Sequence, residues 1–294
     1  MIDLHCHTSI SDNSYSIEDV LNLAKKNKVN RLAITDHDTT FGLKRAIHYG
    51  EQVGVEVIPG IEISGYDFSR DRRAHILGLF IVPGHPALET LCRPMRLARE
   101  QAAYKMVEKV IRLGYAITWE QAMELAKNGT NVYKQHIMHA LIQKGYTKEI
   151  YGDLYRELFS RGSETSEQGK AYVAVRYLDA AAAIRAIRAA GGVPILAHPG
   201  QFDNFSAVPE WVRAGLEGIE VYHPLNNHQS EERAGQLASK YNLVISGGSD
   251  FHGFYTDTGS TPGSRGISED AFEAIKKRAA KIRALHKQEI KTEF

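Results

Sequence analysis

The first eight residues of the chain read Met1-Ile2-Asp3-Leu4-His5-Cys6-His7-Thr8. Ile2 and Leu4 favour a β-strand, in which successive side chains point to opposite faces. His5 and His7 therefore share one face, where two imidazoles can bind one metal ion. Cys6 points to the other face and is expected to pack as a small apolar residue. The alternative to metal binding, for a His-x-His pair taken alone, is that both residues are ordinary surface or core histidines.

Beyond this stretch, short apolar runs alternate with segments of helical periodicity, as in a parallel α/β sheet or barrel. The predicted strands cover residues 2–5, 31–35, 56–62, 75–81, 193–197, 218–222 and 243–246. The predicted helices cover residues 17–27, 40–53, 179–190, 209–214, 230–241 and 269–281. Seven strands predict a (β/α)7-type barrel rather than the usual eight-stranded form.

Residues 83–172 interrupt this alternation, because they are helical in pattern and contain no candidate strand. We interpret them as a helical subdomain inserted into a barrel formed by residues 1–82 and 173–294. Chemistry in such barrels occurs at the face formed by the loops that follow the strands. The insertion is therefore expected to form a cap over that face. A peripheral helical bundle without a functional role is the alternative.

Ligand-type side chains recur next to the ends of the predicted strands. The set is His5, His7, Asp12, His37, Glu62, His75, His198, Asp250 and His252. Barrel geometry brings strand ends together around one axis, so these side chains are expected to converge. Imidazoles and carboxylates without thiolates suit zinc, manganese or iron. Glu62 is the candidate for bridging two ions, because a carboxylate has two oxygens.

Single members of this set have structural alternatives. Asp12 lies in turn-forming sequence and could be an N-cap or turn residue. His37 could be a structural histidine that Asp36 or Asp38 orients. Asp250 could bond the backbone amides of its own loop. The joint pattern favours metal ligation, because buried unpaired histidines and carboxylates are costly.

These motifs resemble the metal motifs of the PHP (polymerase and histidinol phosphatase) family. The matching motifs are His5-x-His7, Ile34-Thr35-Asp36-His37-Asp38, Gly60-Ile61-Glu62, His75, Ala197-His198-Pro199 and Gly248-Ser249-Asp250-Phe251-His252. The resemblance implies a distorted (β/α)7 barrel with a trinuclear metal site. It would place His5, His7, Glu62 and Asp250 on one ion, Glu62, His75 and His198 on a second, and Asp12, His37 and His252 on a third.

The inserted segment, followed by Gly218-Ile219-Glu220-Val221-Tyr222-His223-Pro224, resembles a subgroup of this family that acts on nucleoside 3′,5′-bisphosphates and short RNA ends. The segment Asn131-Val132-Tyr133-Lys134-Gln135-His136-Ile137 is similar to the Arg-Pro-His-Ile stretch of that subgroup. Lys134 and His136 would then face the phosphate. Lys-Gln replaces Arg-Pro here, and Gly253 follows His252 where the subgroup often has a lysine. These departures concern the substrate rather than the metal site.

The inserted segment also carries Arg93, Arg96, Arg99 and Lys105. The three arginines are spaced so that they lie along one helix face, and they could clamp a second phosphate in bidentate geometry. A solvated basic face is the alternative. Tyr104 and Tyr133 could stack on a base, although such aromatic residues also form subdomain cores.

We predict a metal-dependent phosphoesterase that removes the 3′-phosphate of a nucleoside 3′,5′-bisphosphate and also acts on short RNA ends. Adenosine 3′,5′-bisphosphate would be a typical substrate, with AMP as the product. About two or three Mn, Zn or Fe ions would generate the hydroxide nucleophile. The predicted catalytic residues are Glu62, Asp250 and His223, and the predicted substrate contacts are Arg99, Lys134, His136, His223 and His228. For His223 and His228, as general acid or phosphate contact, polar loop residues are the alternative.

Three other functions remain open from the sequence. A histidinol-phosphate phosphatase would use the same metals with a different cap. An amidohydrolase commonly bridges its metals with a lysine carbamate, where Glu62 stands here, and would leave Asp12, His37 and His252 without a role. A non-catalytic metal-binding module is the third.

Composition limits the partners. The net charge is +1, which gives no general attraction for long duplex nucleic acid. No apolar run approaches the roughly 20 residues that a membrane span needs. Two cysteines do not make a disulfide framework. We therefore expect a small phosphorylated substrate and a cytoplasmic location.

Overall fold

A curled sheet forms the centre of the computed structural model, which describes residues 1–162, 166–256 and 258–292. Its strands, in spatial order, are β1 (Ile2–Asp3), β2 (Arg31–Ile34), β3 (Glu56–Asp67), β4 (Arg72–Leu79), β6 (Val193–Leu196), β7 (Gly218–Tyr222) and β8 (Val244–Gly247). The short strand β5 (Leu178–Asp179) pairs with β3 outside this path.

Backbone bonds between the first and last strands nearly close the sheet into a barrel. The Leu4 amide donates to the Gly247 carbonyl at 3.1 Å, and the Asp250 amide donates to the His5 carbonyl at 2.8 Å. The prediction of an α/β barrel with seven main strands and an inserted helical cap is confirmed. Cys6 is fully buried in the core, as expected.

The strand β4 does not run as predicted. It pairs antiparallel with both β3 and β6, whereas the apolar pattern predicted a parallel barrel. The physical reason is the short connection between Asp67 and Arg72, because a parallel neighbour needs a crossover of about a dozen residues. The reversal places the N-terminal half of β4 at the carboxyl ends of its neighbours. His75 therefore lies beside Ser64 of β3 at the functional end.

Helices cover the outside of the barrel. They are α1 (Ile17–Lys26), α2 (Leu43–Val53), α7 (Ala180–Ala189), α8 (Pro199–Phe202), α9 (Val208–Arg213) and α10 (His228–Tyr241), with 3-10 turns at Asn204–Ala207 and Gly253–Tyr255. The first helix shows why such segments fold. Ser16 caps it and forms a capping box with Asp19. One apolar face of the helix, which includes Ile17 and Leu21, is buried against the barrel.

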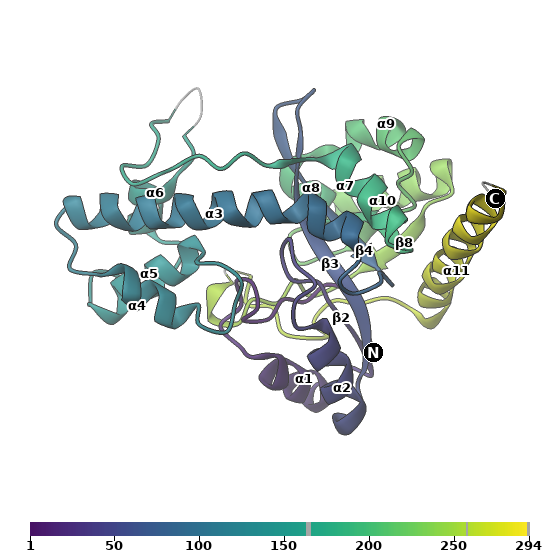
Figure 1. Ribbon diagram of the computed structural model, residues 1–294, viewed down its shortest axis with the longest axis horizontal. Coiled ribbons are helices and arrows are strands. Elements are labelled where there is room, and N and C mark those ends of the chain that lie inside the picture. Colours follow the sequence, from purple (N-terminus) through teal and green to yellow (C-terminus); the bar gives the residue numbers. More distant parts are fainter. Residues whose placement is uncertain (163–165, 257, 293–294) are drawn as a thin grey trace.

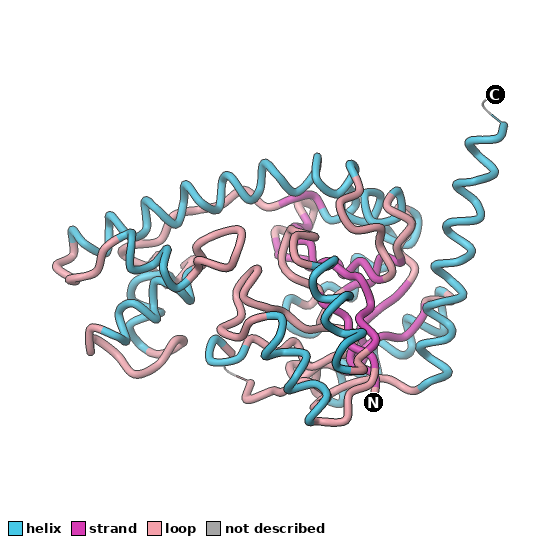
Figure 2. Tube along the Cα trace, turned by 60° about the horizontal axis from the view of Figure 1, so that its bottom comes forward, coloured by secondary structure: helices cyan, strands magenta, loops and turns pink. Residues whose placement is uncertain are grey.

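The last helix, α11 (Glu269–Thr292), packs against the end of the barrel opposite the functional loops. Phe272, Ile275 and Ile282 are buried with Leu4 and Leu77 in one apolar cluster. Its far end projects from the body of the protein in Figure 2, beyond the predicted end at residue 281. No helix in the described part of the chain is long and apolar enough to span a membrane.

The cap consists of α3 (Pro86–Arg112), α4 (Trp119–Leu125), α5 (Lys134–Gln143) and α6 (Asp153–Phe159). These helices extend to one side of the barrel (Figure 1). The long helix α3 joins the two parts, because Leu88 and Cys92 belong to the barrel core while Met106 and Val110 belong to the cap core. The division of the chain at residues 83 and 172 stays a prediction. Residues 163–165, 257 and 293–294 of the predicted segments lie outside the described residues.

The closing contact between β8 and β1 leaves no room for a side chain at Gly248. A Cβ there would lie 2.3 Å from the His5 amide nitrogen. Gly248→Ala should therefore lower the free energy of unfolding by about 1–3 kcal/mol and reduce the metal content, because His5 must shift. The matched control is Gly235→Ala in α10, where nothing lies within 4 Å of the added Cβ. Thermal unfolding and metal analysis check both variants, and a Gly248→Ala protein with unchanged values would contradict this packing.

Candidate metal centre

The carboxylate of Glu62 lies at the centre of the cluster and is 1% exposed. Its two oxygens face two different groups of histidines. One oxygen, Oε2, lies 3.5 Å from His5 Nε2, 3.2 Å from His7 Nε2 and 3.2 Å from His37 Nδ1. The other, Oε1, lies 2.9 Å from both His75 Nδ1 and His198 Nε2. This arrangement suits a carboxylate that bridges two cations.

A first group of donor atoms converges next to Glu62 Oε2. The Nε2 atoms of His5 and His7 are 3.3 Å apart, and each lies 3.2 Å from Asp250 Oδ1. His5 and His7 follow β1, and Asp250 follows β8, so the closed barrel brings them together. These four residues could hold one metal ion.

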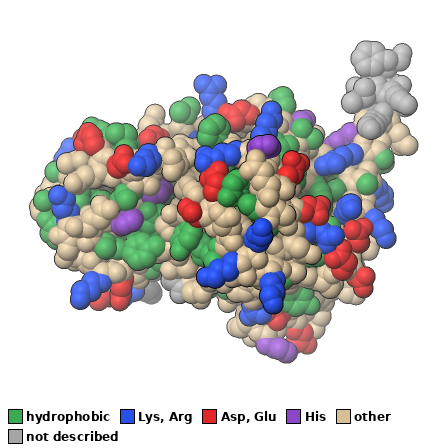
Figure 3. Space-filling model, turned by 90° about the horizontal axis from the view of Figure 1, so that it is seen from below, with side chains coloured by type: hydrophobic (Ala, Val, Ile, Leu, Met, Phe, Trp, Pro, Cys, Tyr) green, Lys and Arg blue, Asp and Glu red, His purple; other side chains and the backbone are tan. Residues whose placement is uncertain are grey.

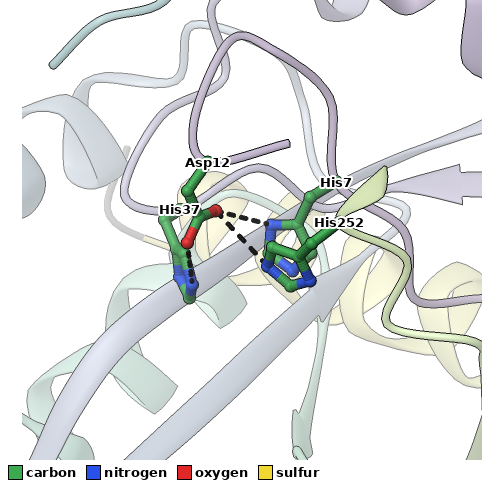
Figure 4. A group of neighbouring side chains, drawn as sticks. All are labelled: His7, Asp12, His37 and His252. Atoms are coloured by element: carbon green, nitrogen blue, oxygen red, sulfur yellow. Dashed lines mark ion pairs between the residues drawn. The ribbon is translucent and has the colours of Figure 1, made fainter. Parts of the chain in front are cut away.

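A second group forms around Asp12, in the loop between β1 and α1 (Figure 4). Asp12 Oδ1 lies 3.7 Å from His7 Nδ1 and 3.4 Å from His252 Nε2. Its other oxygen lies 3.8 Å from His37 Nε2. Gln135 Nε2 of the cap helix α5 donates to this second oxygen at 3.1 Å. All nine ligand-type residues predicted from the sequence therefore lie in one contiguous cluster.

The buried carboxylates and imidazoles stabilise one another in charged forms. Burial alone would lower the pKa of His7, but Asp250 and Glu62 outweigh burial and raise this pKa to about 10. Burial also opposes ionisation of Glu62, yet the histidines around it together hold the pKa of this carboxyl well below its usual range. His37 itself differs, because burial lowers its pKa to about 4. Its imidazole is therefore neutral, which is the form that binds a metal.

The donor set fits divalent metal ions. Among the residues that the structure describes, two buried carboxylate oxygens of the cluster, Asp12 Oδ1 and Asp250 Oδ1, have imidazole nitrogens 3.2–3.7 Å away but accept no hydrogen bond. A buried polar atom without a partner costs free energy, and a cation offers one to a lone pair. Imidazole nitrogens and carboxylate oxygens suit zinc, manganese or iron.

Three residues in the loops around the cluster adopt left-handed backbone conformations. The φ angles are +57° at Asp38, +26° at His198 and +49° at Asp250. Such conformations are unfavourable for residues other than glycine and persist where the surroundings impose them. The backbone therefore holds His198 and Asp250 toward the cluster at some cost in local strain.

The sequence did not reveal the buried carboxylate of Glu220. It accepts from His198 N at 2.7 Å through Oε2, and its Oε1 lies 3.0 Å from His5 Nδ1. A carboxylate on the second nitrogen of a metal-binding histidine fixes the orientation of the ring and raises its basicity. The available signal was a glutamate inside the apolar strand 218–222. Asp3 was missed too; burial raises its pKa to about 6, and it accepts from the amides of His5 and Ser249.

Asp36 and Asp38 lie near His37 in sequence but have other partners. Asp36 accepts from the Thr8 amide and hydroxyl at 2.8 and 2.7 Å. Asp38 accepts from the Ser64 amide at 2.8 Å and pairs with Arg99. Both carboxylates therefore fix the loops of the site, and the described contacts do not give either one the role of orienting His37.

The basic residues predicted on α3 divide into two pairs. Arg96 donates to the Asp38 carbonyl at 2.8 Å, and Arg99 pairs with the Asp38 carboxylate and donates to Ser64 Oγ at 3.0 Å. Arg93 and Lys105 are exposed. Only Arg99 of these four lines a cavity that adjoins the metal cluster. Its guanidinium also lies over the Tyr133 ring, 4.7 Å from the centroid.

Two adjoining cavities open onto the cluster. A cavity of about 150 Å³ is lined by residues that include Glu62, His198 and Asp250. A cavity of about 290 Å³ between the cap and the barrel is lined by residues that include Arg99 and Lys134. Asp12, His37, His75, Gln135, Tyr151 and Gln201 line both. A ligand can therefore reach the metal cluster and the basic residues of the cap at the same time.

The other predicted substrate contacts lie elsewhere. His136 is 1% exposed; its Nδ1 accepts from the Tyr133 amide, and its ring packs edge-on against Tyr255. His228 is exposed at the start of α10. His223 is fully buried behind Asp250, with its Nε2 3.1 Å from Asp250 Oδ2. The two cavities described above are not lined by any of these three histidines.

Comparison with known proteins identifies the family. Residues 3–192 match the PHP domain. The chain belongs to the PHP domain family. It is 42% identical over 251 residues to the phosphoribosyl 1,2-cyclic phosphate 1,2-diphosphodiesterase of Eggerthella lenta, covering 85% of this chain and 94% of that protein. It is 30% identical over 256 residues to the 3′,5′-nucleoside bisphosphate phosphatase of Chromobacterium violaceum, covering 85% and 87%.

A solved structure from Bifidobacterium adolescentis, assigned as a metal-dependent phosphoesterase, has a similar fold. It superposes with a TM-score of 0.83 at 27% identity and covers 93% of this chain and 94% of that one. The PHP fold observed here is thus shared along nearly the whole chain. The family and these relatives confirm the prediction of a metal-dependent phosphoesterase.

Glu220 is expected to control metal binding through His5. Glu220→Gln keeps the shape but removes the charge, so metal affinity should fall by about 10- to 100-fold, as for other outer partners of metal ligands. Glu217→Gln is the matched control, because Glu217 precedes the same strand but pairs with Arg188 and Arg278 outside the site. Metal titration of both variants measures the difference. Equal affinity in the Glu220 variant and the wild type would rule out this orienting role.

Proposed function

We propose that the protein hydrolyses a phosphate ester on a ribose unit that carries a second phosphate group. The observation that carries this proposal is the basic cavity, in which Arg99 and Lys134 lie next to the ligand-type residues Asp12, His37 and His75. The named substrates of the two relatives share this feature, because phosphoribosyl cyclic phosphate and nucleoside 3′,5′-bisphosphate both place two phosphate groups on one ribose.

The aromatic residues of the cavity favour a sugar phosphate over a nucleoside. Arg99 lies over Tyr133 at 4.7 Å, Arg73 over Tyr177 at 5.3 Å and Lys134 near Tyr155 at 5.9 Å. One face of each tyrosine thus holds a cation, which leaves less aromatic surface for a base. Tyr104 packs edge-on against Trp119, outside the lining of this cavity. A phosphoribosyl cyclic phosphate is therefore the first candidate, and a nucleoside 3′,5′-bisphosphate is the second.

The proposed ligand sets follow the observed groups. His5, His7, Glu62 and Asp250 would hold one ion, Glu62, His75 and His198 a second, and Asp12, His37 and His252 a third. Divalent ions there would supply Lewis-acid chemistry, activating water and neutralising charge that develops on the phosphoryl oxygens. Zinc, manganese and iron all suit these ligands.

His223 serves as a positioning residue in this proposal. Its Nδ1 accepts from the Leu225 amide at 3.1 Å, so in the neutral ring the proton is on Nε2. That proton points at Asp250 Oδ2, 3.1 Å away. The carboxylate of Asp250 is thereby fixed between His223 on one side and the Nε2 atoms of His5 and His7 on the other. This geometry favours orientation of Asp250 over protonation of a leaving group by His223.

Local contacts must bind the second phosphate. The net charge of +1 gives no general attraction for an anion, and basic and acidic side chains are interspersed over the face drawn in Figure 3. Asp38 and Ser64 hold the Arg99 guanidinium in place. Lys134 lies 4.7 Å from the Tyr172 ring centroid, and burial, with the nearby Arg73 and Arg99, lowers its pKa to about 7. A bound phosphate would favour the charged form of this lysine.

Product analysis by phosphorus NMR or chromatography over a set of substrates tests the proposal, because ring opening of a cyclic phosphate yields a monoester before any inorganic phosphate is released. The set contains 5-phosphoribosyl 1,2-cyclic phosphate, adenosine 3′,5′-bisphosphate, a short 5′-phosphorylated RNA and histidinol phosphate. We expect the highest kcat/KM for one of the first two, and loss of turnover after metal removal with recovery on adding Mn, Zn or Fe. Histidinol phosphate as the best substrate, or full turnover by metal-free protein, would refute the proposed function.

Lys134 should matter only for substrates with a second phosphate. Lys134→Met keeps the apolar stem, and we expect transition-state stabilisation to fall by about 1.5–3 kcal/mol for the loss of one charge-assisted contact. The measurement is kcat/KM for adenosine 3′,5′-bisphosphate and for adenosine 3′-monophosphate. Lys144→Met, at the exposed end of the same helix, is the matched control and should behave as wild type. Equal losses on both substrates would remove Lys134 from recognition of the second phosphate.

A further inference from the structure

Arg73 was not among the residues predicted from the sequence, yet its place in β4 puts it at the functional end of the barrel. It precedes His75 by two residues, and side chains at that spacing in a strand share one face. In the hairpin with β3, His75 lies opposite Ser64 and Arg73 lies opposite Tyr66. Arg73 is therefore the next side chain outward from a predicted metal ligand, on the same rigid strand.

The partners of Arg73 differ from those of its neighbours. Arg70 pairs with Asp67 at 2.9 Å, and Arg72 pairs with Asp203 at 3.0 Å. Within residues 1–162, 166–256 and 258–292, Arg73 has no carboxylate within ion-pair distance, and its guanidinium lies over the Tyr177 ring at 5.3 Å. Neighbouring arginines on this hairpin are thus neutralised by carboxylates, whereas Arg73 is held in position without neutralisation.

Arg73 lines the 290 Å³ cavity together with Lys134, Arg99 and His75. Of the three cations, only Arg99 has a carboxylate partner among the described residues, Asp38. Like charges gathered in a partly buried space repel one another, and an anion that binds between them relieves the repulsion. A phosphate group is a suitable anion for this cavity, because guanidinium groups bind its oxygens in bidentate geometry.

We propose that Arg73 binds the non-reacting phosphate and sets the distance between the two phosphates of the substrate. This inference rests on the proposed function. Two residues of a β-strand span about 7 Å, so the Arg73 and His75 positions are separated by about that distance along β4. Arg99 and Lys134 belong to the cap, whereas Arg73 shares its strand with a predicted metal ligand. Arg73 thus keeps a fixed spacing to the metal cluster and selects compounds whose phosphates are one pentose apart.

A chain-length series measures this spacing directly. The probes are bisphosphates of straight-chain diols, from propane-1,3-diol to hexane-1,6-diol, titrated by calorimetry into the protein purified with its metals. Wild-type protein should bind one length best. Arg73→Met should weaken binding at that length by about 10- to 100-fold, the loss of one charge-assisted contact, and should flatten the dependence on length. The Arg72→Met control, at a neighbouring position whose arginine pairs with Asp203, should keep the wild-type profile.

Two further measurements separate this role from a structural one. Arg73→Lys should retain part of the affinity, since a point charge remains but the bidentate fork is lost. Butyl phosphate, which has one phosphate, should bind equally well to wild type and to Arg73→Met. No length preference in wild type, equal losses in the Arg72 and Arg73 variants, or weaker binding of butyl phosphate to Arg73→Met would overturn the inference. Failure of the proposed function would appear separately, as no turnover of any phosphate ester by wild-type protein.

Discussion

The buried carboxylate of Glu62 is the constraint on which the rest of the structure depends. Taking a carboxylate out of water is unfavourable unless charged or hydrogen-bonding partners surround it. Here the partners are five histidines, His5, His7, His37, His75 and His198. They come from β1, β2, β4 and β6 or the loops after them, so the carboxylate is compensated only when these strands are in register around β3. Correct closure of the barrel and assembly of the donor cluster are therefore one requirement.

The antiparallel hairpin of β3 and β4 extends the site beyond the metal cluster. Parallel strands deliver residues to the functional end only at their carboxyl termini. An antiparallel strand enters from that end, and the β3–β4 hairpin continues past Glu62 as far as Asp67 and Arg72. Ser64 and Arg73 lie on this extension, opposite His75 and Tyr66. The same reversal that departs from the predicted parallel barrel thus builds the wall on which a second phosphate can lie.

The sequence was sufficient for the donor cluster and insufficient for its surroundings. Eight of the nine ligand-type residues lie at or after the carboxyl ends of predicted strands, and these ends converge in any barrel of this kind. His75 begins its strand, so its placement rested on the resemblance to the PHP family and depends on the antiparallel direction of β4. The direction of β4 could not be predicted, since apolar periodicity is the same for parallel and antiparallel strands. The cap shows the same limit: which side of α5 faces the barrel depends on tertiary packing, and the structure turns Gln135 toward Asp12 while His136 packs into the cap core. Glu220 resembles an ordinary strand residue until its contact with His5 is seen.

The donor geometry also separates the functions that the sequence left open. An amidohydrolase needs no group around Asp12, yet Asp12 lies between His7, His37 and His252, with Gln135 of the cap donating to it. A purely structural metal site is closed by its protein ligands, whereas two adjoining cavities open onto this cluster. A histidinol-phosphate phosphatase would have one phosphate to bind. Arg73 and Lys134 of the larger cavity would then lack a counter-charge, and burial already lowers the pKa of Lys134 to about 7. In the proposed function, two phosphates on one small substrate would occupy both ends of the cavity.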